Sequence, residues 1–332
     1  MILGSSKEKS VSPAAWTAAI EKLITDQRES WPLLNNNVNN LSHVNTRKIE
    51  FDGFEIVLQH NPERITSTTA QVDSKSISMR PCFLCLNNLP AEQSALEYNK
   101  HYLILCNPYP IFPGHLTITH RKHIPQNLVL NFDDLIEISR DLNQNFTLFY
   151  NGPNCGASAP DHFHFQAIPK KTLPLENEIA KLKELNRGNL LKEDKTEICF
   201  LDNYLRYGIV MESSSKGEIQ SIFKNVANIF RNISLPNEEP MWNIISSYGE
   251  NKWTVVIFPR RNHRPDQYYK EGSAKIMISP AAVDLGGVFV LPREEDWKKI
   301  AAHDVIDIFK QVSVTKEFFE YLRKKITDYM TK

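Results

Sequence analysis

The stretch that decides the fold is Phe149-Tyr-Asn-Gly-Pro-Asn-Cys-Gly-Ala-Ser-Ala-Pro-Asp-His-Phe-His-Phe-Gln-Ala-Ile-Pro169. It opens with apolar residues that are typical of a buried strand, and the segment after them contains two glycines and a serine. Loops of this composition leave backbone N–H groups free to bind phosphate oxygens. The stretch therefore predicts a strand, an anion-binding loop and a second strand.

The second strand of this stretch alternates polar and aromatic side chains. Because successive side chains of a strand point to opposite faces, His162, His164 and Gln166 share one face, and Phe163 and Phe165 share the other. The aromatic face suits a core, so we expect the polar face to line a site. A polar strand face with satisfied histidines is the alternative. Three polar groups in register beside the loop favour a functional site.

The patterns around this stretch predict an α+β fold built on an antiparallel sheet. Alternating or apolar runs predict four strands, at residues 51–59, 102–106, 115–119 and 146–150. Further along, a Gly-Glu-Asn-Lys turn joins two apolar runs, 242–247 and 253–258, in a hairpin. Helical spacing predicts helices that begin near residue 13, span 133–145 and 218–233, and run from residue 296 to the C-terminal end.

The chain divides into four expected segments. They are an N-terminal helical segment (1–50), a half with the candidate site (51–170), a helical connector (171–240), and a second half with a C-terminal helix (241–332). The strand ends at 116–123 and 255–263 each run into two basic residues and then a histidine. This short match indicates a duplicated fold with one active half, and chance is the alternative.

Composition limits the classes of partner. The 332 residues include 39 Lys plus Arg and 39 Asp plus Glu, so no overall basic field favours nucleic acid or a membrane surface. The N-terminal residues contain no apolar segment of signal-peptide length, and no run approaches the length of a membrane span. Five cysteines, an odd number, fit a reducing compartment. We therefore expect a cytoplasmic protein.

Two further clusters stand out. Cys82-Phe-Leu-Cys85 supplies half of a tetrahedral zinc site, with buried free cysteines or a redox pair as alternatives. The basic run Arg260-Arg261-Asn-His263 could bind a phosphate, and an exposed basic turn is the alternative. Cys155, which has no dedicated base nearby, is interpreted as a packing residue.

The glycine- and serine-containing loop followed by His-x-His-x-Gln resembles the signature of the histidine-triad superfamily in its transferase branch. That branch contains galactose-1-phosphate uridylyltransferase, diadenosine tetraphosphate phosphorylase and GDP-L-galactose phosphorylase. Asn107 after a strand and Pro113-Gly114-His115-Leu extend the likeness, which covers residues 51–170 well and 241–292 loosely. The chain departs from the pattern at Asp161, which separates the proline from the first histidine.

The resemblance implies a histidine-triad-like antiparallel sheet with helices, in two degenerate halves, and a nucleotidyl-transfer site. His164 would be the nucleophile that attacks the α-phosphorus, with Gln166 and Ser158 holding the oxygens. Substrate-binding residues would be Asn107, Asn151, Gly156, Arg260, Arg261 and His263. The resemblance also implies that His123 and His162 complete a structural zinc site with Cys82 and Cys85.

Gln166 bears on the outcome of the reaction. An amide cannot supply a proton to a leaving group, whereas phosphate leaving groups and acceptors need little acid or base help. The sequence therefore predicts transfer of a nucleoside monophosphate from a nucleotide sugar or dinucleoside polyphosphate to phosphate or a sugar phosphate. A nucleotide hydrolase and a non-catalytic nucleotide-binding protein are the alternatives. A homodimer is left open.

Overall fold

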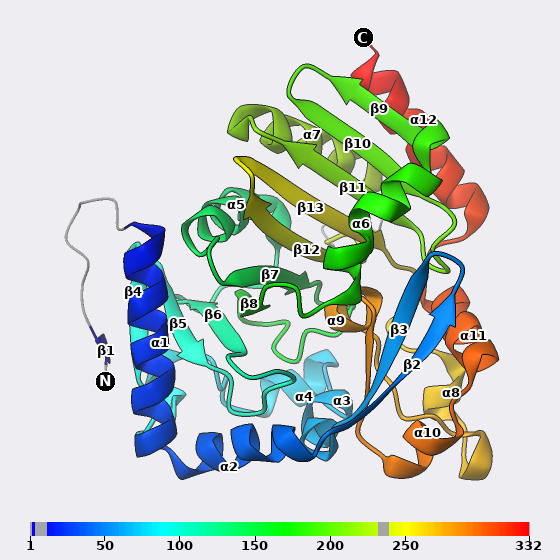
Figure 1. The fold of residues 1–332 in the computed structure, drawn as a ribbon. Coiled ribbons are helices and arrows are strands. Elements are labelled where there is room, and N and C mark those ends of the chain that lie inside the picture. Colours follow the sequence, from blue (N-terminus) through cyan, green and yellow to red (C-terminus); the bar gives the residue numbers. More distant parts are fainter. Residues whose placement is uncertain (1, 4–11, 232–238, 332) are drawn as a thin grey trace.

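The computed structural model describes residues 2–3, 12–231 and 239–331 of the chain, and Figure 1 shows their arrangement. The strands are β1 (Ile2–Leu3), β2 (Asn45–Phe51), β3 (Phe54–His60), β4 (Ala95–Tyr98), β5 (Tyr102–Cys106), β6 (Leu116–His120), β7 (Phe146–Asn151), β8 (His164–Pro169), β9 (Leu190–Glu193), β10 (Thr196–Leu201), β11 (Gly208–Ser213), β12 (Trp242–Gly249), β13 (Lys252–Pro259) and β14 (Val288–Leu291). The helices are α1 (Pro13–Ser30), α2 (Pro32–Asn40), α3 (Ile65–Thr68), α4 (Ser74–Ser78), α5 (Phe132–Asp141), α6 (Pro174–Leu185), α7 (Lys216–Arg231), α8 (Asp266–Tyr269), α9 (Ala282–Leu285), α10 (Glu294–Lys299), α11 (Ala302–Val312) and α12 (Lys316–Met330).

Eleven strands form one sheet in the order β1-β4-β5-β6-β8-β7-β12-β13-β11-β10-β9. The order reads as two copies of one pattern that meet where β7 pairs with β12: β4-β5-β6-β8-β7 corresponds to β9-β10-β11-β13-β12. In each copy a helix, α5 or α7, joins the third strand to the strand at the seam. The predicted α+β fold on an antiparallel sheet is thus confirmed, and its two halves share a topology.

The strand order corrects the expected helical connector. Residues 171–240 do contain α6 and α7, but they also contain β9, β10 and β11, which continue the sheet. Lys and Glu suit exposed helices, and they equally suit the solvent side of edge strands, so composition misled the assignment. We propose that the second half begins in this region.

The sequence match between residues 116–123 and 255–263 compares two strands, β6 and β13, that are not equivalent in the two halves of the sheet. By topology β13 is the counterpart of β8, the strand of the His-x-His-x-Gln motif, and β6 corresponds to β11. The run 116–123 leaves β6 and the run 255–263 leaves β13, so their similar ends do not reflect equivalent positions. In β13, Val255, Val256, Ile257 and Phe258 are all buried. The second half therefore has no copy of the motif on this strand.

Two local expectations differ from the structure. The strand expected at 51–59 is a hairpin turn followed by β3, because Phe51 pairs with Phe54 across a turn in which Gly53 has a φ of +90°. The helix expected from residue 296 is three helices, and Thr315 begins the last by accepting the N–H of Phe318. The last two residues of the helix expected over 218–233 lie outside the described residues.

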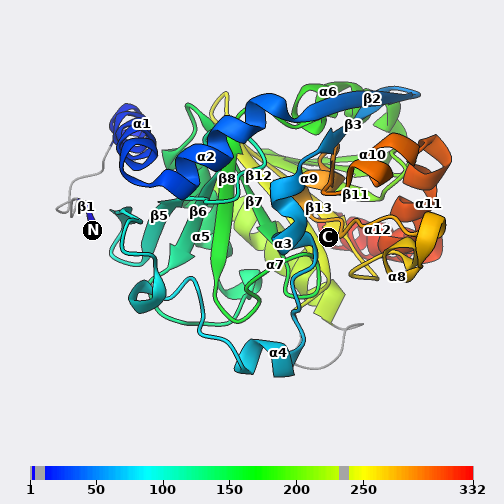
Figure 2. The same ribbon diagram turned by 90° about the horizontal axis from the view of Figure 1, so that it is seen from below.

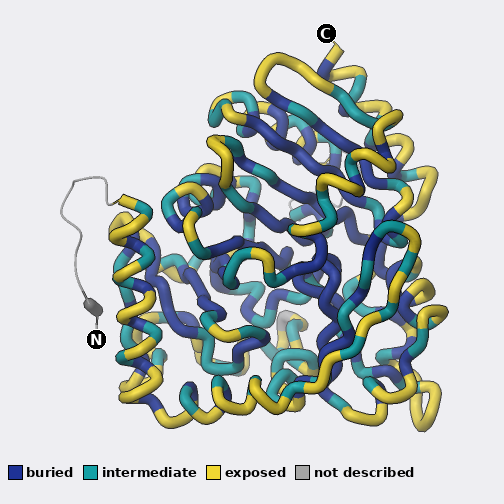
Figure 3. Tube along the Cα trace, viewed as in Figure 1, coloured by how far each residue is buried: buried dark blue, intermediate teal, exposed yellow. Residues whose placement is uncertain are grey.

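Apolar layers cover both faces of the large sheet. Phe163 and Phe165 pack on one face in a core that also receives side chains from α1, α5, α7 and α12. On the other face, a second core joins the sheet to α6, α9, α11 and the small sheet β14-β3-β2. Figure 3 shows the buried strands enclosed by partly exposed helices. No helix within the described ranges is both long and apolar enough to cross a membrane.

Candidate active site and metal centre

A cavity of about 660 Å³ lies beside β8, between segments of both halves of the chain. The second half contributes Ser279, Ala281, Val283, Asp284 and Val290 of β14 to its lining. The structure brings six of the predicted site residues to this cavity: His164, Gln166, Ser158, Asn107, Asn151 and Gly156. The predicted alternation is confirmed for His164 and Gln166, because Phe163 and Phe165 lie in the core on the opposite face. His162 precedes β8 and lies in a cluster with two cysteines and His123 instead of lining the cavity.

The ring of His164 is oriented by its own strand. Its Nδ1 donates a hydrogen bond to the carbonyl oxygen of His162 at 2.8 Å, so Nε2 carries the lone pair. Burial lowers the pKa of His164 to about 4, which keeps the imidazole neutral at neutral pH. Gln126 fixes the backbone, since its side chain bonds to both the N–H and the carbonyl of His164. The site therefore presents a neutral imidazole whose Nε2 has no hydrogen-bond partner among the described residues.

The amide of Gln166 is also oriented. The N–H of Ile111 donates to Nδ1 of His115, so Nε2 of His115 carries the proton and donates to Oε1 of Gln166 at 2.9 Å. Burial lowers the pKa of His115 to about 3, which maintains this neutral tautomer. With its oxygen occupied, Gln166 can offer only its NH₂ group to the cavity. That group can donate to a phosphate oxygen near His164.

The loop between β7 and β8 lies tightly against the second half. Gly156 has a φ of +94°, and a Cβ there would lie 2.7 Å from the Cβ of Ala281, so only glycine fits. Oδ1 of Asn151 accepts hydrogen bonds from Nδ2 of Asn243 and from the N–H of Ala282. These contacts tie the loop to β12 and α9. Asn151 thus lines the cavity and also links the halves.

Asn107 holds the next loop. Its Nδ2 donates to the hydroxyl of Thr117 at 3.2 Å, and its Oδ1 accepts the N–H of Tyr109 at 3.0 Å. Both neighbours also line the cavity. Cys155 is fully buried, and burial raises the pKa of its thiol to about 12. This agrees with its interpretation as a packing residue.

The basic run near residue 260 does not reach the cavity, contrary to the expectation that it binds phosphate. The buried guanidinium of Arg260 donates to the carbonyls of Val312, Pro280, Asn262 and His263 and to Oδ1 of Asn243. Arg261 donates to the last carbonyls of α11, where a cation is favoured. His263 contacts Ser279, and burial lowers its pKa to about 4. These side chains stabilise the second half.

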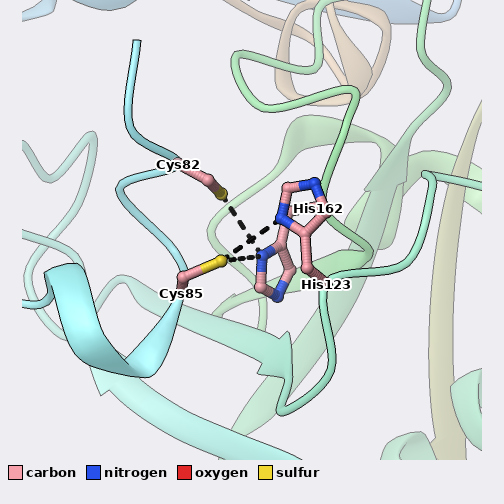
Figure 4. Close-up of side chains that lie close together, drawn as sticks. All are labelled: Cys82, Cys85, His123 and His162. Atoms are coloured by element: carbon pink, nitrogen blue, oxygen red, sulfur yellow. Dashed lines mark hydrogen bonds between the residues drawn. The ribbon is translucent and has the colours of Figure 1, made fainter. Parts of the chain in front are cut away.

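Four predicted ligands do come together in one cluster, drawn in Figure 4. The ligand atoms of Cys82, Cys85, His123 and His162 all lie within 4.8 Å of one another. Sγ of Cys82 lies 3.3 Å from Nδ1 of His162, and Sγ of Cys85 lies 3.2 Å from Nδ1 of His123. A tetrahedral site with usual metal–ligand distances has edges of about 3.5 Å. The four residues can therefore hold a metal ion.

The second ring nitrogens of His123 and His162 also have contacts that suit a metal site. Nε2 of His162 donates to the carbonyl of His120, which leaves Nδ1 as the free ligand atom. Nε2 of His123 lies 3.8 Å from Oδ2 of Asp161. Histidine ligands commonly orient their second nitrogen toward a carbonyl or carboxylate in this way. Asp161, the departure from the family pattern, thus contacts the cluster.

Sequence reasoning missed several residues at the site. In the sequence His115 is only part of the Pro-Gly-His-Leu motif, and its contact with Gln166 requires the pairing of β6 with β8. Gln126, Arg64, Arg80 and Asp284 carry no sequence signal that separates them from ordinary polar residues. Asp284 lines the cavity, and burial raises its pKa to about 6. All five are brought to the site by long-range contacts.

Comparisons with known proteins agree with this fold. A family model described as "Domain of unknown function (DUF4922)" matches residues 23–169, and one described as "GDPGP1-like, C-terminal domain" matches residues 177–332. The crystal structure of yeast Ap4A phosphorylase Apa2 superposes with a TM-score of 0.60 at 15% identity, covering 89% of this chain and 97% of that chain. The chain therefore shares the fold of this enzyme over most of its length.

Two further structures of the same yeast protein match. Its complex with Ap4A has a TM-score of 0.59 at 15% identity and covers 89% of this chain and 97% of that chain. Its complex with AMP has a TM-score of 0.57 at 14% identity and covers 92% of this chain and 97% of that chain. A sequence search of curated proteins finds no match. The predicted resemblance to the histidine-triad transferase branch is therefore confirmed by fold and by the C-terminal family model.

Proposed function

We propose that the protein is a nucleotidyltransferase of the phosphorylase type, which acts through a covalent intermediate on His164. The observation that carries the proposal is the neutral, inward-facing Nε2 of His164 beside the NH₂ group of Gln166. A neutral imidazole is a nucleophile, and a fixed donor beside it can stabilise charge on the phosphoryl oxygens. The likeness to Ap4A phosphorylase and the GDPGP1-like family model support this activity class.

The proposed first step forms an N–P bond. The lone pair of Nε2 of His164 attacks the α-phosphorus of a nucleotide sugar or dinucleoside polyphosphate, and the bond from that phosphorus to the bridging oxygen breaks. The leaving phosphate takes the bonding electrons. The ring gains positive charge, which the carbonyl of His162 stabilises through the Nδ1–H bond. Gln166 and Ser158 are the proposed donors to the phosphoryl oxygens.

The second step returns the enzyme to its starting state. An oxygen of inorganic phosphate or a sugar phosphate attacks the same phosphorus, the N–P bond breaks, and the electron pair returns to Nε2. The side-chain amide of Gln166 is not basic at neutral pH, so it cannot take a proton from an attacking water molecule. Phosphate is already an anionic nucleophile at neutral pH and needs no base. The site therefore favours transfer to phosphate over hydrolysis.

The proposed role of the metal cluster is structural, and zinc is the ion that a Cys₂His₂ set prefers. Bound zinc would supply a crosslink between the Cys82–Cys85 turn and His162. His162 is two residues before His164, and its carbonyl orients the nucleophile. Cys82, Cys85, His123 and His162 would thereby fix the ring position of His164.

Label trapping tests the function. The protein is incubated without phosphate with Ap4A, UDP-glucose or a GDP-hexose, each labelled at the α-phosphorus. We expect acid-labile label on the wild-type protein, release of nucleoside diphosphate when phosphate is added, and no label on His164→Asn. His303→Asn, an exposed histidine, is the control. Persistent labelling of His164→Asn, or release of nucleoside monophosphate at the same rate without phosphate, would contradict the proposal.

A further inference from the structure

Two guanidinium groups line the cavity, and nothing in the sequence singled them out. Among the described residues that line the cavity, Arg64 and Arg80 are the two with an arginine or lysine side chain. Asp284 is the one with a carboxylate side chain. Both arginines come from the segment that carries α3 and α4, which lies below β8 and α9 in Figure 1. In a chain with no net charge, this concentration of positive charge marks a local anion site.

Arg80 has an unused donor. Its Nη2 donates to Oδ1 of Asp161 at 3.1 Å and lies 3.4 Å from the carbonyl oxygen of Ser158. Its Nη1 is buried and has no hydrogen-bond partner among the residues that the structure describes. A buried donor without a partner is unfavourable, so a phosphate oxygen that reached Nη1 would stabilise the bound state. Through the Ser158 contact, Arg80 lies directly beside the loop that leads into β8.

Arg64 approaches the site from the other loop. Its Nη1 donates a hydrogen bond to the carbonyl oxygen of Tyr109 at 2.6 Å. Tyr109 belongs to the loop that leads to His115. The positive charge of Arg64 is close enough to His115 to contribute to the lowered pKa of that histidine. His115 in turn holds Gln166. Arg64 and Arg80 therefore line the same cavity as His164 and Gln166. Arg64 lies on the side of His115, and Arg80 lies on the side of Ser158.

The segment that carries these arginines is held in place. Arg264, from the second half, donates from Nη2 to the carbonyls of Thr68 and Ala70 and from Nε to the hydroxyl of Ser279. Asp161 joins Arg80 to the metal cluster, because its other oxygen lies 3.8 Å from Nε2 of His123. Figure 2 shows α3 near the centre of the molecule in this view and α4 at its edge. The arginines are thus part of a built site and not of an open surface.

We propose that Arg64 and Arg80 form a subsite for a second phosphate group, separate from the α-phosphate at His164. The inference rests on the proposed function and names its substrate class. In the first step the subsite binds the phosphate that leaves, and in the second step it binds the inorganic phosphate that attacks. Guanidinium groups bind phosphate through paired hydrogen bonds. Because two cations select an anionic acceptor over neutral water, the subsite also favours phosphorolysis.

Binding without turnover tests the subsite. Full-length His164→Asn is titrated calorimetrically with AMP, ADP, GMP and GDP, with and without a second substitution, Arg64→Gln or Arg80→Gln. We expect the preferred diphosphate to bind about tenfold or more tightly than its monophosphate, and each arginine substitution to reduce that ratio toward one. Monophosphate affinity should change little. Arg80→Lys keeps the charge and should give an intermediate ratio.

Arg121→Gln is the matched control. Arg121 also pairs with a carboxylate, Glu97 at 2.9 Å, and its side chain is 33% exposed against 26% for Arg80. We expect this variant to keep the wild-type ratio. Equal loss of mono- and diphosphate binding in both cavity variants, or an unchanged ratio, would overturn the subsite. Label trapping on His164 is measured separately. If the protein takes up label but gives either of these two binding results, only the subsite proposal is rejected and the proposed function stands. If the protein binds no nucleotide, both the proposed function and the subsite are rejected.

Discussion

Oε1 of Gln166 accepts a hydrogen bond from Nε2 of His115 at 2.9 Å, and this contact decides what the amide offers to the cavity. His115 is buried and neutral, and its other nitrogen is occupied by the N–H of Ile111. The amide therefore points its NH₂ group inward. A residue that cannot donate a proton in catalysis becomes a fixed hydrogen-bond donor.

Gln166→Glu tests that donor with almost no change of shape. The carboxylate can still accept from His115, but it lacks the NH₂ group and places negative charge beside the phosphoryl oxygens. We expect kcat for nucleotidyl transfer to fall by about 10²–10³, as when one oxyanion donor is lost. Steady-state kinetics measures the effect, and circular dichroism checks the fold. A kcat within a few-fold of wild type would remove Gln166 from the catalytic group.

Arg260 and Arg261 should behave differently in spite of their adjacency. Arg260→Ala leaves several buried acceptors, including Oδ1 of Asn243, without a donor. We expect the free energy of unfolding to fall by about 3 kcal/mol or more. Arg261→Ala removes exposed contacts at the end of α11 and should cost at most about 1 kcal/mol. Urea denaturation measures both. Equal effects would mean that burial does not distinguish the two side chains as described.

Two measurements test the metal cluster: the zinc content of the purified protein and its melting temperature. Purified wild-type protein should contain about one zinc ion per chain by mass spectrometry of the metals, and Cys85→Ser should contain far less. We also expect Cys85→Ser to have a lower melting temperature, because the ligands would no longer be crosslinked. Cys106→Ser, in the core and outside the cluster, controls for loss of a thiol. Zinc-free wild-type protein that melts at the same temperature before and after chelation would refute the site.

Glu239 predicts a pH dependence of stability. Burial raises the pKa of its carboxyl to about 8, although the side chain accepts from the hydroxyl of Tyr150 and the N–H of Leu128. The folded state then binds a proton that the unfolded chain releases above pH 4.5, so this group lowers stability as the pH rises from about 4.5 to about 8. Glu239→Gln removes the titration.

The difference in unfolding free energy between wild type and Glu239→Gln isolates this group from all others. We expect the variant to gain on wild type steadily between pH 5 and pH 8, by up to about 1.4 kcal/mol per pH unit, and to keep a constant difference above pH 8. Denaturation curves at a series of pH values give that difference. A difference that does not vary with pH would show that the pKa of Glu239 is not raised.

The strand that carries the site can be recognised from the local sequence alone. Alternation placed His164 and Gln166 on one face and the phenylalanines on the other, because side-chain direction along a strand is set by the backbone. The same local rules gave the hairpin of β12 and β13 and the capped start of α1. The spacing of Cys82 and Cys85 indicated half of a metal site, and the family resemblance added His123 and His162. The structure brings the ligand atoms of all four within 4.8 Å of one another.

Which distant side chains share the cavity depends on how the whole chain packs. Arg260 looked like a phosphate ligand in the sequence, but the packing of α11 and β12 around it occupies its donors. Arg64 and Arg80 looked ordinary, and the contacts of Tyr109, Asp161 and Arg264 bring them to the wall. The counterpart of β8 also emerged only from strand order. Local sequence sets direction and period, whereas burial and hydrogen-bond partners depend on segments far away along the chain.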